Sequence, residues 1–196
     1  TIHMEVRLTL EPVRDQITPR IRICLLIGEE RLYVVKSIPQ MIDAIDTQTP
    51  VEYGKGFVFH PEWMRFGTVQ ERILKILRAL CLAQKEAGAL LRGAEQRDLA
   101  LPEPFAEEIL RELMNTPFRL KVGEKTVAVK PVRARKIPLQ FRVSSDLHGL
   151  TVVAMFPKEF RPLLPSCSFA LVGENVVAVE EQQRGVLRVL YQEQLG

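Results

Sequence analysis

Hydrophobic residues recur in a strand–turn–strand pattern at three places along this chain of 196 residues. In each place an apolar segment leads into a Gly-Glu pair, at Gly28-Glu29, Gly123-Glu124 and Gly173-Glu174, and a second apolar segment follows. Glycine at the first central position suits a two-residue type II′ turn, because that position needs a positive φ angle. The pattern therefore predicts three β-hairpins. The third is apolar on both faces, which predicts a central position in the fold.

Other segments predict further strands and helices around these hairpins. Alternating apolar and polar residues from Met4 to Glu11 indicate a half-buried strand. Thr68 and Glu71 have the spacing of a capping box, which predicts that the longest helix begins there. A basic linker is predicted from Pro131 to Pro138. The remaining predicted elements are helices that begin near Ser37, Pro104 and Glu180, and strands at residues 57–59, 139–143 and 150–156.

These elements indicate an α+β fold in which helices pack on antiparallel β-hairpins, arranged as two related lobes. The polar segment from Gly93 to Glu103 contains Pro102, and the lobe boundary is placed within it near Asp98. Residues 1–97 then form an N-terminal lobe with a hairpin and the long helix. Residues 98–196 form a C-terminal lobe with a helix, a basic hairpin, the apolar hairpin and a terminal helix.

Positive charge is concentrated in one segment of a chain whose net charge is only +3. From Phe118 to Arg142, eight Lys and Arg residues stand against one acid, Glu124, which gives a local net charge of +7. Strand alternation is expected to turn the polar members of the basic hairpin outward. The candidate nucleic-acid-binding residues are Arg119, Lys121, Lys130, Arg133, Arg135, Lys136 and Arg142. Such a surface can neutralise phosphates without sequence specificity. The alternative interpretation is a solvated strand edge that positive charge protects from pairing.

Aromatic residues alternate with cations from Tyr53 to Phe66, in a segment that also contains Lys55, Trp63 and Arg65. Aromatic rings next to cations can stack on unpaired bases. Aromatic residues at strand spacing more often belong to a hydrophobic core, and this second interpretation is favoured here.

Catalytic and metal-binding motifs are not found in the sequence. The histidines and cysteines lack the spacing of metal ligands. Gly123 to Thr126 lacks the residue order of a phosphate-binding loop, and neither a nucleophile elbow nor a glycine-rich dinucleotide loop is present. We therefore expect no catalytic residue, no metal and no cofactor in this chain.

The sequence also indicates a compartment. The widely separated Cys24, Cys81 and Cys167 lie in apolar surroundings and are interpreted as reduced core residues of a cytosolic protein. An apolar run long enough to span a membrane and a signal peptide are both lacking. The first residue is Thr1 rather than Met, which suggests either a piece of a longer chain or a cloning remnant around His3-Met4.

Six segments along the chain share one resemblance to a known family. They are Leu26–Lys36, Gly54–Phe57, Leu99–Pro102, Lys136–Phe141, Leu164–Phe169 and Val177–Tyr191. Together these segments resemble the helicase-associated domain of bacterial Swi/Snf-family ATPases. They consist of core and turn residues and span nearly the whole chain. The resemblance implies a domain that lies upstream of an ATP-dependent, double-stranded-DNA-translocating motor.

The motor's own motifs are absent here, so the resemblance transfers no catalytic residue, and ATP and magnesium are expected only in the motor. It implies a non-catalytic accessory domain that positions or gates the motor and adds non-specific DNA contacts through the basic hairpin. The expected partners are the motor of the same chain and double-stranded DNA, without a membrane, in the cytoplasm or at the nucleoid. The alternative is a protein-interaction scaffold that docks on the motor and does not contact DNA.

Overall fold

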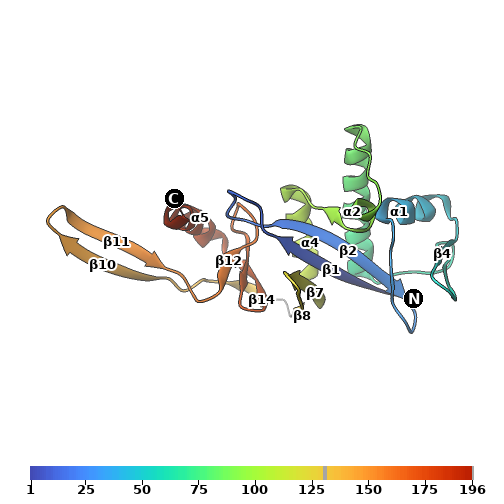
Figure 1. The fold of residues 1–196 in the computed structure, drawn as a ribbon. Coiled ribbons are helices and arrows are strands. Elements are labelled where there is room, and N and C mark those ends of the chain that lie inside the picture. Colours follow the sequence, from blue (N-terminus) through green and yellow to red (C-terminus); the bar gives the residue numbers. More distant parts are fainter. Residues whose placement is uncertain (130–131, 196) are drawn as a thin grey trace.

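The computed structural model describes the backbone of residues 1–129 and 132–195, and within these the side chains of residues 1–129 and 135–192. Strands gather into one large and one smaller sheet, and helices cover the large sheet, as Figure 1 shows. The α+β fold of antiparallel hairpins with packed helices is thereby confirmed. The helices are α1 (Ile38–Thr47), α2 (Thr68–Glu86), α3 (Ala94–Arg97), α4 (Glu103–Leu113) and α5 (Glu181–Leu195).

The large sheet has six strands in the order β3-β2-β1-β7-β8, and β6 also pairs with β2. Its strands are β1 (His3–Glu11), β2 (Arg20–Gly28), β3 (Tyr33–Val34), β6 (Leu99–Ala100), β7 (Phe118–Val122) and β8 (Lys125–Val129). All neighbouring strands are antiparallel except β1 and β7, which run parallel with Arg7 opposite Arg119. Because β1 and β7 come from opposite sides of the predicted lobe boundary, residues of both predicted lobes form this one sheet.

Strand alternation gives the large sheet one apolar and one polar face. Along β1, Val6 and Leu8 are buried, while Glu5 and Arg7, each one position before them, are half-buried. The apolar side chains share a core with the buried faces of α2 and α4, which contact each other over this face of the sheet. Burial of these side chains is the main contribution to the stability of this part of the fold.

The smaller sheet has four strands in the order β12-β13-β14-β9, and β14 and β9 run parallel. Its strands are β12 (Phe160–Pro162), β13 (Phe169–Val172), β14 (Asn175–Val179) and β9 (Val132–Arg135). A separate small core joins Ala170 and Val177 of this sheet to Leu187 of α5. The prediction that the third hairpin is central is confirmed, because β13 and β14 are the inner strands. The basic segment predicted as a linker contains β9, so that prediction is wrong.

Two further hairpins stand apart from these sheets. Strands β4 (Val51–Tyr53) and β5 (Phe57–Phe59) form a short one. Strands β10 (Gln140–Asp146) and β11 (Gly149–Met155) form a long one, which projects from the body of the molecule in Figure 1. We call β10–β11 the arm.

The three Gly-Glu hairpins form differently. Gly123 and Gly173 have φ angles of 62° and 63° in two-residue turns, as predicted. The prediction for Gly28 is wrong, because it ends β2 without a positive φ and the strands are joined through residues 29–32. Glycine is needed there because a Cβ atom would collide with the backbone oxygen of Arg31. Close backbone approach, rather than a left-handed conformation, explains this residue.

The predicted cap agrees with the structure at α1 and differs from it at α2. Ser37 caps α1 by accepting a hydrogen bond from the Gln40 amide, 3.1 Å away. The predicted capping box of α2 is wrong. The N-cap is Gly67, and the Glu71 carboxylate instead accepts from the Phe66 amide at 3.4 Å. The loop therefore uses Glu71 to hold the residue before the cap.

Candidate nucleic-acid interface

The polar face of the large sheet collects cations from three strands. Cross-strand pairing aligns Thr9 of β1 with Arg22 of β2 and with Lys121 of β7, so the three side chains lie on one face. The same alternation places the other polar residues of these strands on this side. We call this surface the cationic face, and its charged members are Glu5, Arg7, Glu11, Arg20, Arg22, Arg119 and Lys121. Five cations and two acids give it a formal net charge of +3.

The two acids of the cationic face are both engaged in ion pairs. Glu5 lies between two arginines, with Arg7 Nε at 3.2 Å from one carboxylate oxygen and Arg119 Nε at 2.9 Å from the other. Glu11 lies 3.1 Å from Arg22 Nε. The parallel β1–β7 pairing creates the contact between Glu5 and Arg119, which are 114 residues apart in the chain.

The remaining two cations of the cationic face are free. Among the residues whose side chains the structure describes, no acidic group lies within ion-pairing distance of Arg20 or Lys121, and both are exposed. A solvated, unpaired cation can approach a phosphate without first breaking a contact within the protein. Arg20 and Lys121 are therefore the members of this face best placed to bind an anion.

The structure distributes the seven predicted nucleic-acid-binding residues over several elements. Arg119 and Lys121 lie on the cationic face, whereas Arg135 ends β9 of the smaller sheet and Lys136 follows it. Arg142 lies in the arm, on β10. Those with described side chains are all exposed. Lys130 and the side chain of Arg133 lie outside the described residues.

Sequence reasoning missed three of the five cations of the cationic face. Arg7, Arg20 and Arg22 were not identified because they come from β1 and β2, far from the basic segment in sequence. The alternating pattern of β2 could have identified two of them, because Arg20 and Arg22 occupy the polar positions of an otherwise apolar strand. What the sequence did not contain was the parallel β1–β7 register that brings them beside Arg119 and Lys121.

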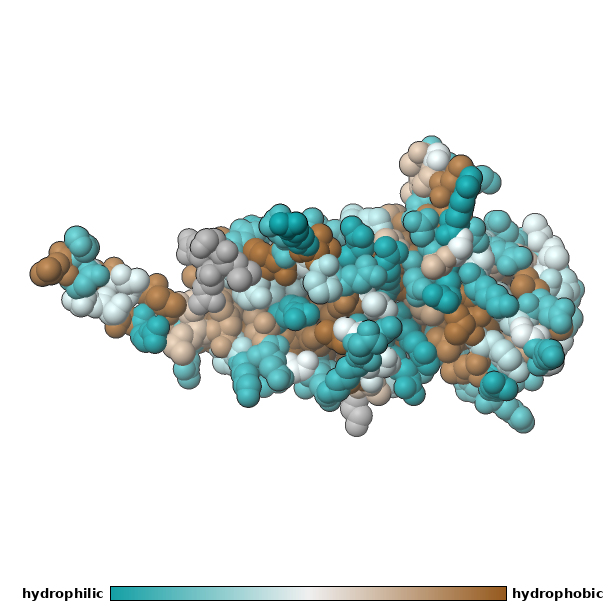
Figure 2. Space-filling view, in the orientation of Figure 1, coloured by the Kyte–Doolittle hydropathy of each residue, from teal (hydrophilic) through white to brown (hydrophobic). Residues whose placement is uncertain are grey.

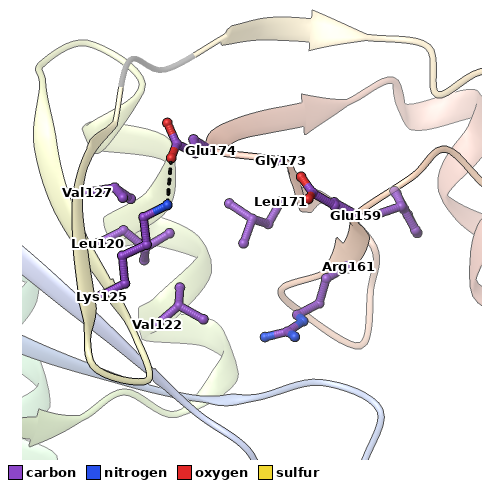
Figure 3. A pocket seen from close by; sticks show the side chains of 10 residues that line it. Leu120, Val122, Lys125, Val127, Glu159, Arg161, Leu171, Gly173 and Glu174 are labelled. Carbon is purple, nitrogen blue, oxygen red and sulfur yellow. Dashed lines mark hydrogen bonds and ion pairs between the residues drawn. The ribbon is translucent and has the colours of Figure 1, made fainter.

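The opposite face of the β7–β8 hairpin borders a cleft of about 390 Å³ beside the smaller sheet, shown in Figure 3. Leu120 and Val127 of the hairpin and Leu171 of β13 form part of its apolar lining. Lys125 reaches across to Glu174, with 3.1 Å between Nζ and Oε1. One of the eight cations of the basic segment is therefore turned away from the cationic face and paired.

The thiols of Cys24 and Cys81 are poor nucleophiles. Burial, reinforced by the charge of Asp98, raises the pKa of Cys24 to about 11, although Arg7 and Arg97 oppose the shift. Burial and the charge of Asp43 raise the pKa of Cys81 to about 11. Both groups stay protonated at neutral pH, and only a thiolate attacks or binds metal readily. As predicted, Cys167 is buried, whereas Cys24 and Cys81 are only half-buried.

The aromatic segment divides between core and surface. Tyr53, Phe57 and Phe59 are buried, and burial raises the pKa of Tyr53 to about 12. The interpretation of these rings as core residues is confirmed. Trp63 is the exception, with 61% of its surface exposed and its ring stacked on His60 at a centroid distance of 5.0 Å.

Metal sites, membrane spans and relatives were also sought. The residues with described side chains contain no group of three or more His, Cys, Asp or Glu that could hold a metal ion. Within the described chain, no helix is long and apolar enough to cross a membrane. Comparison with protein-family models, with curated proteins and with solved structures found no match.

Proposed function

We propose that this chain is a non-catalytic accessory domain of a bacterial Swi/Snf-type DNA-dependent ATPase, and that it contacts the phosphates of duplex DNA through the cationic face. The observation that carries the DNA contact is the parallel pairing of β1 with β7, which unites arginines and one lysine from distant segments on one face. The resemblance of the segments around Gly28, Gly54 and Lys136 to the helicase-associated domain supports the family. The motor and a cytoplasmic or nucleoid location are part of the same proposal.

The chemistry of the cationic face suits non-specific binding. Backbone phosphates attract cations irrespective of base sequence, and affinity arises largely from the release of counterions. Arg20 and Lys121 supply charges that are unpaired among the described side chains, while Arg7, Arg22 and Arg119 are held in place by Glu5 and Glu11. Binding is therefore expected to be weak and strongly dependent on salt concentration.

An accessory role agrees with the titration behaviour of the described groups. The side chains whose pKa is clearly displaced are three cysteines, Tyr53 and Arg97. In the thiols and Tyr53 the displacement favours the neutral, unreactive form because burial disfavours the charge. In Arg97 the hydrogen bond and charge of Asp98 merely hold the guanidinium protonated. None is tuned toward neutral pH, where a general acid or base would be useful.

The test measures the binding of a fluorescent DNA duplex to the 196-residue chain as the salt concentration is varied. Replacing the two unpaired cations, by Arg20→Glu and Lys121→Glu together, should weaken binding about equally for unrelated sequences. It should also reduce the magnitude of the slope of log K against log salt by about 2, because each lost phosphate contact removes about 0.9.

The matched control is Lys55→Glu with Lys75→Glu, which makes the same change of net charge in the β4–β5 turn and on α2. Both control lysines are exposed. If the control weakens DNA binding as much as the test variant, net charge alone is responsible and the cationic face is not the site. Wild-type chain that binds no duplex at low salt would also contradict the proposal.

The second candidate function is a protein-interaction scaffold that docks on the motor. It is favoured by a specific observation, namely that three of the five cations of the face are already paired with acids. On this alternative the isolated chain binds the purified motor but not DNA. A pull-down with the motor, with and without nuclease treatment, separates the two functions.

A further inference from the structure

The arm exposes an apolar surface that neither sheet covers. Directly paired residues of β10 and β11 share a face, so Phe141 and Val143 lie on the same side as Val152 and Leu150. The opposite side carries polar residues such as Arg142 and Ser144. The exposed fractions on the apolar side are 57% for Phe141, 60% for Val143, 74% for Leu150 and 62% for Val152. Leu147, in the turn, is fully exposed, and Figure 2 shows hydrophobic residues at the tip of the arm and along it.

A two-stranded arm with this much exposed apolar surface is not expected to be stable in water without a partner. A two-stranded hairpin is at best marginally stable in water, and three or more strands are usually needed. Contiguous exposed apolar residues commonly mark a surface that another chain covers. Among the described residues, β10 pairs only with β11, so its other edge is open and can accept a further strand.

The hydrogen-bonding edge of β10 is set by its turn. Only Leu147 and His148 separate the paired residues Asp146 and Gly149. In a two-residue hairpin that closing pair exchanges backbone hydrogen bonds, and the pattern then alternates along the strands. The even-numbered residues of β10 therefore bond to β11, and the odd-numbered residues from Phe141 to Ser145 direct their N–H and C=O groups outward.

We infer that this open edge pairs with the same edge of a second copy, antiparallel about a two-fold axis at Ser144. In this register Arg142 faces Asp146 of the partner subunit, and the symmetry repeats the contact in reverse. Both contacts fall at non-hydrogen-bonded positions, where opposite side chains come closest. One oxygen of Asp146 accepts from the His148 amide at 2.7 Å, which leaves the other oxygen for the arginine.

Charge disfavours the two registers in which the axis moves by two residues along β10. An axis at Arg142 would oppose two arginines, and an axis at Asp146 would oppose two aspartates. Both arrangements are destabilising because like charges directly across a strand pair repel. The edge of β11 has no charged residue from Gly149 to Met155 and so contains no comparable selection. The arm carries one arginine and one aspartate, and an isologous pairing neutralises both.

The resulting assembly is a four-stranded sheet with one continuous apolar face. Odd-numbered positions pair across the axis, which sets Val143 beside Ser145 of the partner subunit and Phe141 beside the partner's Leu147. Backbone hydrogen bonds supply the attraction, and the two charge pairs fix the register. This self-association does not depend on the proposed DNA contact, because the cationic face lies on a different sheet.

The experiment is sedimentation equilibrium of the 196-residue chain up to about 1 mM, the scale on which so small an interface is expected to dimerise. The wild-type chain should show a reversible monomer–dimer equilibrium. Arg142→Asp alone and Asp146→Arg alone should each raise the dimer Kd about tenfold or more, because two attractive pairs become two repulsive ones. The double variant, with both changes in one chain, should restore dimerisation.

Mixing the two single variants is the most discriminating measurement. A copy with Arg142→Asp presents two aspartates, and a copy with Asp146→Arg presents two arginines. Neither should self-associate, yet together they should form a one-to-one heterodimer, detectable by native mass spectrometry. The matched control is Arg111→Asp on α4, an exposed arginine paired with Glu107 at 3.4 Å, which should leave the Kd unchanged. Unchanged thermal unfolding of each variant at low concentration establishes that the fold is retained.

Two results would overturn the inference. A wild-type chain that stays monomeric throughout this concentration range would assign the arm to a different partner. A dimer that ignores both single charge reversals, or single variants that fail to form a heterodimer, would exclude the β10 pairing about Ser144.

Discussion

Two hairpins of the C-terminal half both carry apolar residues but lie in opposite environments. In β13–β14 every side chain except those of the turn and its flanking residues is buried or nearly so, because β12 and β9 flank the pair and α5 packs nearby. In β10–β11 the apolar residues Phe141 and Val152 are more than half exposed, and no described strand flanks the pair. Both hairpins have two-residue turns, so local turn chemistry does not account for the difference.

The comparison teaches that the elements beside a hairpin decide whether its apolar residues are covered. Flanked on both edges, β13–β14 is part of the core and its contribution is to stability. Open along β10, the β10–β11 hairpin contributes little to the body, and its exposed apolar residues are available for association. The two hairpins should therefore respond differently to the same kind of substitution.

The largest difference is expected from a buried charge. Val176→Asp in β14 replaces a fully buried side chain with a carboxylate that has no partner, which should reduce the free energy of unfolding by about 4 kcal/mol or more. Val152→Asp in β11 should change it by less than about 0.5 kcal/mol, since the side chain is 62% exposed. Urea denaturation monitored by circular dichroism measures both.

Val176→Ala is the control that separates lost packing from buried charge. It should reduce the free energy of unfolding by less than Val176→Asp does. Equal losses for the two aspartate variants would mean that the arm is packed against the body, contrary to the structure.

The sequence was sufficient for local elements and insufficient for their assembly. Alternation located β1, and the Gly-Glu turns located β7–β8 and β13–β14, because both signals depend on residues close in sequence. The basic segment at residues 132–135 was taken for a linker because its pairing with β14 is parallel and distant. The exposure of the arm was also unpredictable, since its apolar pattern matches that of a covered strand.

The candidate site shows the same limit. Arg119 and Lys121 were identified from a local charge excess, whereas Arg20 belongs to the same face only through the β1–β2 and β1–β7 registers. Ion pairing was equally hidden, because Glu5 neutralises Arg119 across 114 residues of sequence. The nucleic-acid contact itself stays a prediction.

A smaller difference is expected at the turns. Gly173 and Gly149 have φ angles of 63° and 125°, so alanine is strained at either position. Gly173→Ala should lower the free energy of unfolding by about 1–2 kcal/mol, because the β13–β14 turn belongs to a cooperative core. Gly149→Ala should accelerate amide hydrogen exchange in the arm and leave the global denaturation midpoint unchanged.

Gly185→Ala in α5 is the matched control for these turns, because Gly185 has no positive φ and open space around its Cα. There alanine should be neutral or stabilising by up to about 1 kcal/mol. A global destabilisation by Gly149→Ala equal to that of Gly173→Ala would show that the arm unfolds with the body.

The smallest effect is expected from shortening the arm. Replacing residues 143–152 with Asn-Gly joins Arg142 and Val153, which form a hydrogen-bonded pair, through a two-residue turn suited to a hairpin. The free energy of unfolding should change by less than about 0.5 kcal/mol, because the removed residues contribute nothing to either hydrophobic core.

This free energy should be measured at a low micromolar protein concentration, where self-association cannot add stability by mass action. At high concentration the shortened chain should remain monomeric, since it lacks Asp146 and the axis residue Ser144. A loss of more than about 1 kcal/mol at low concentration would place the arm within the cooperative unit and remove the contrast with β13–β14.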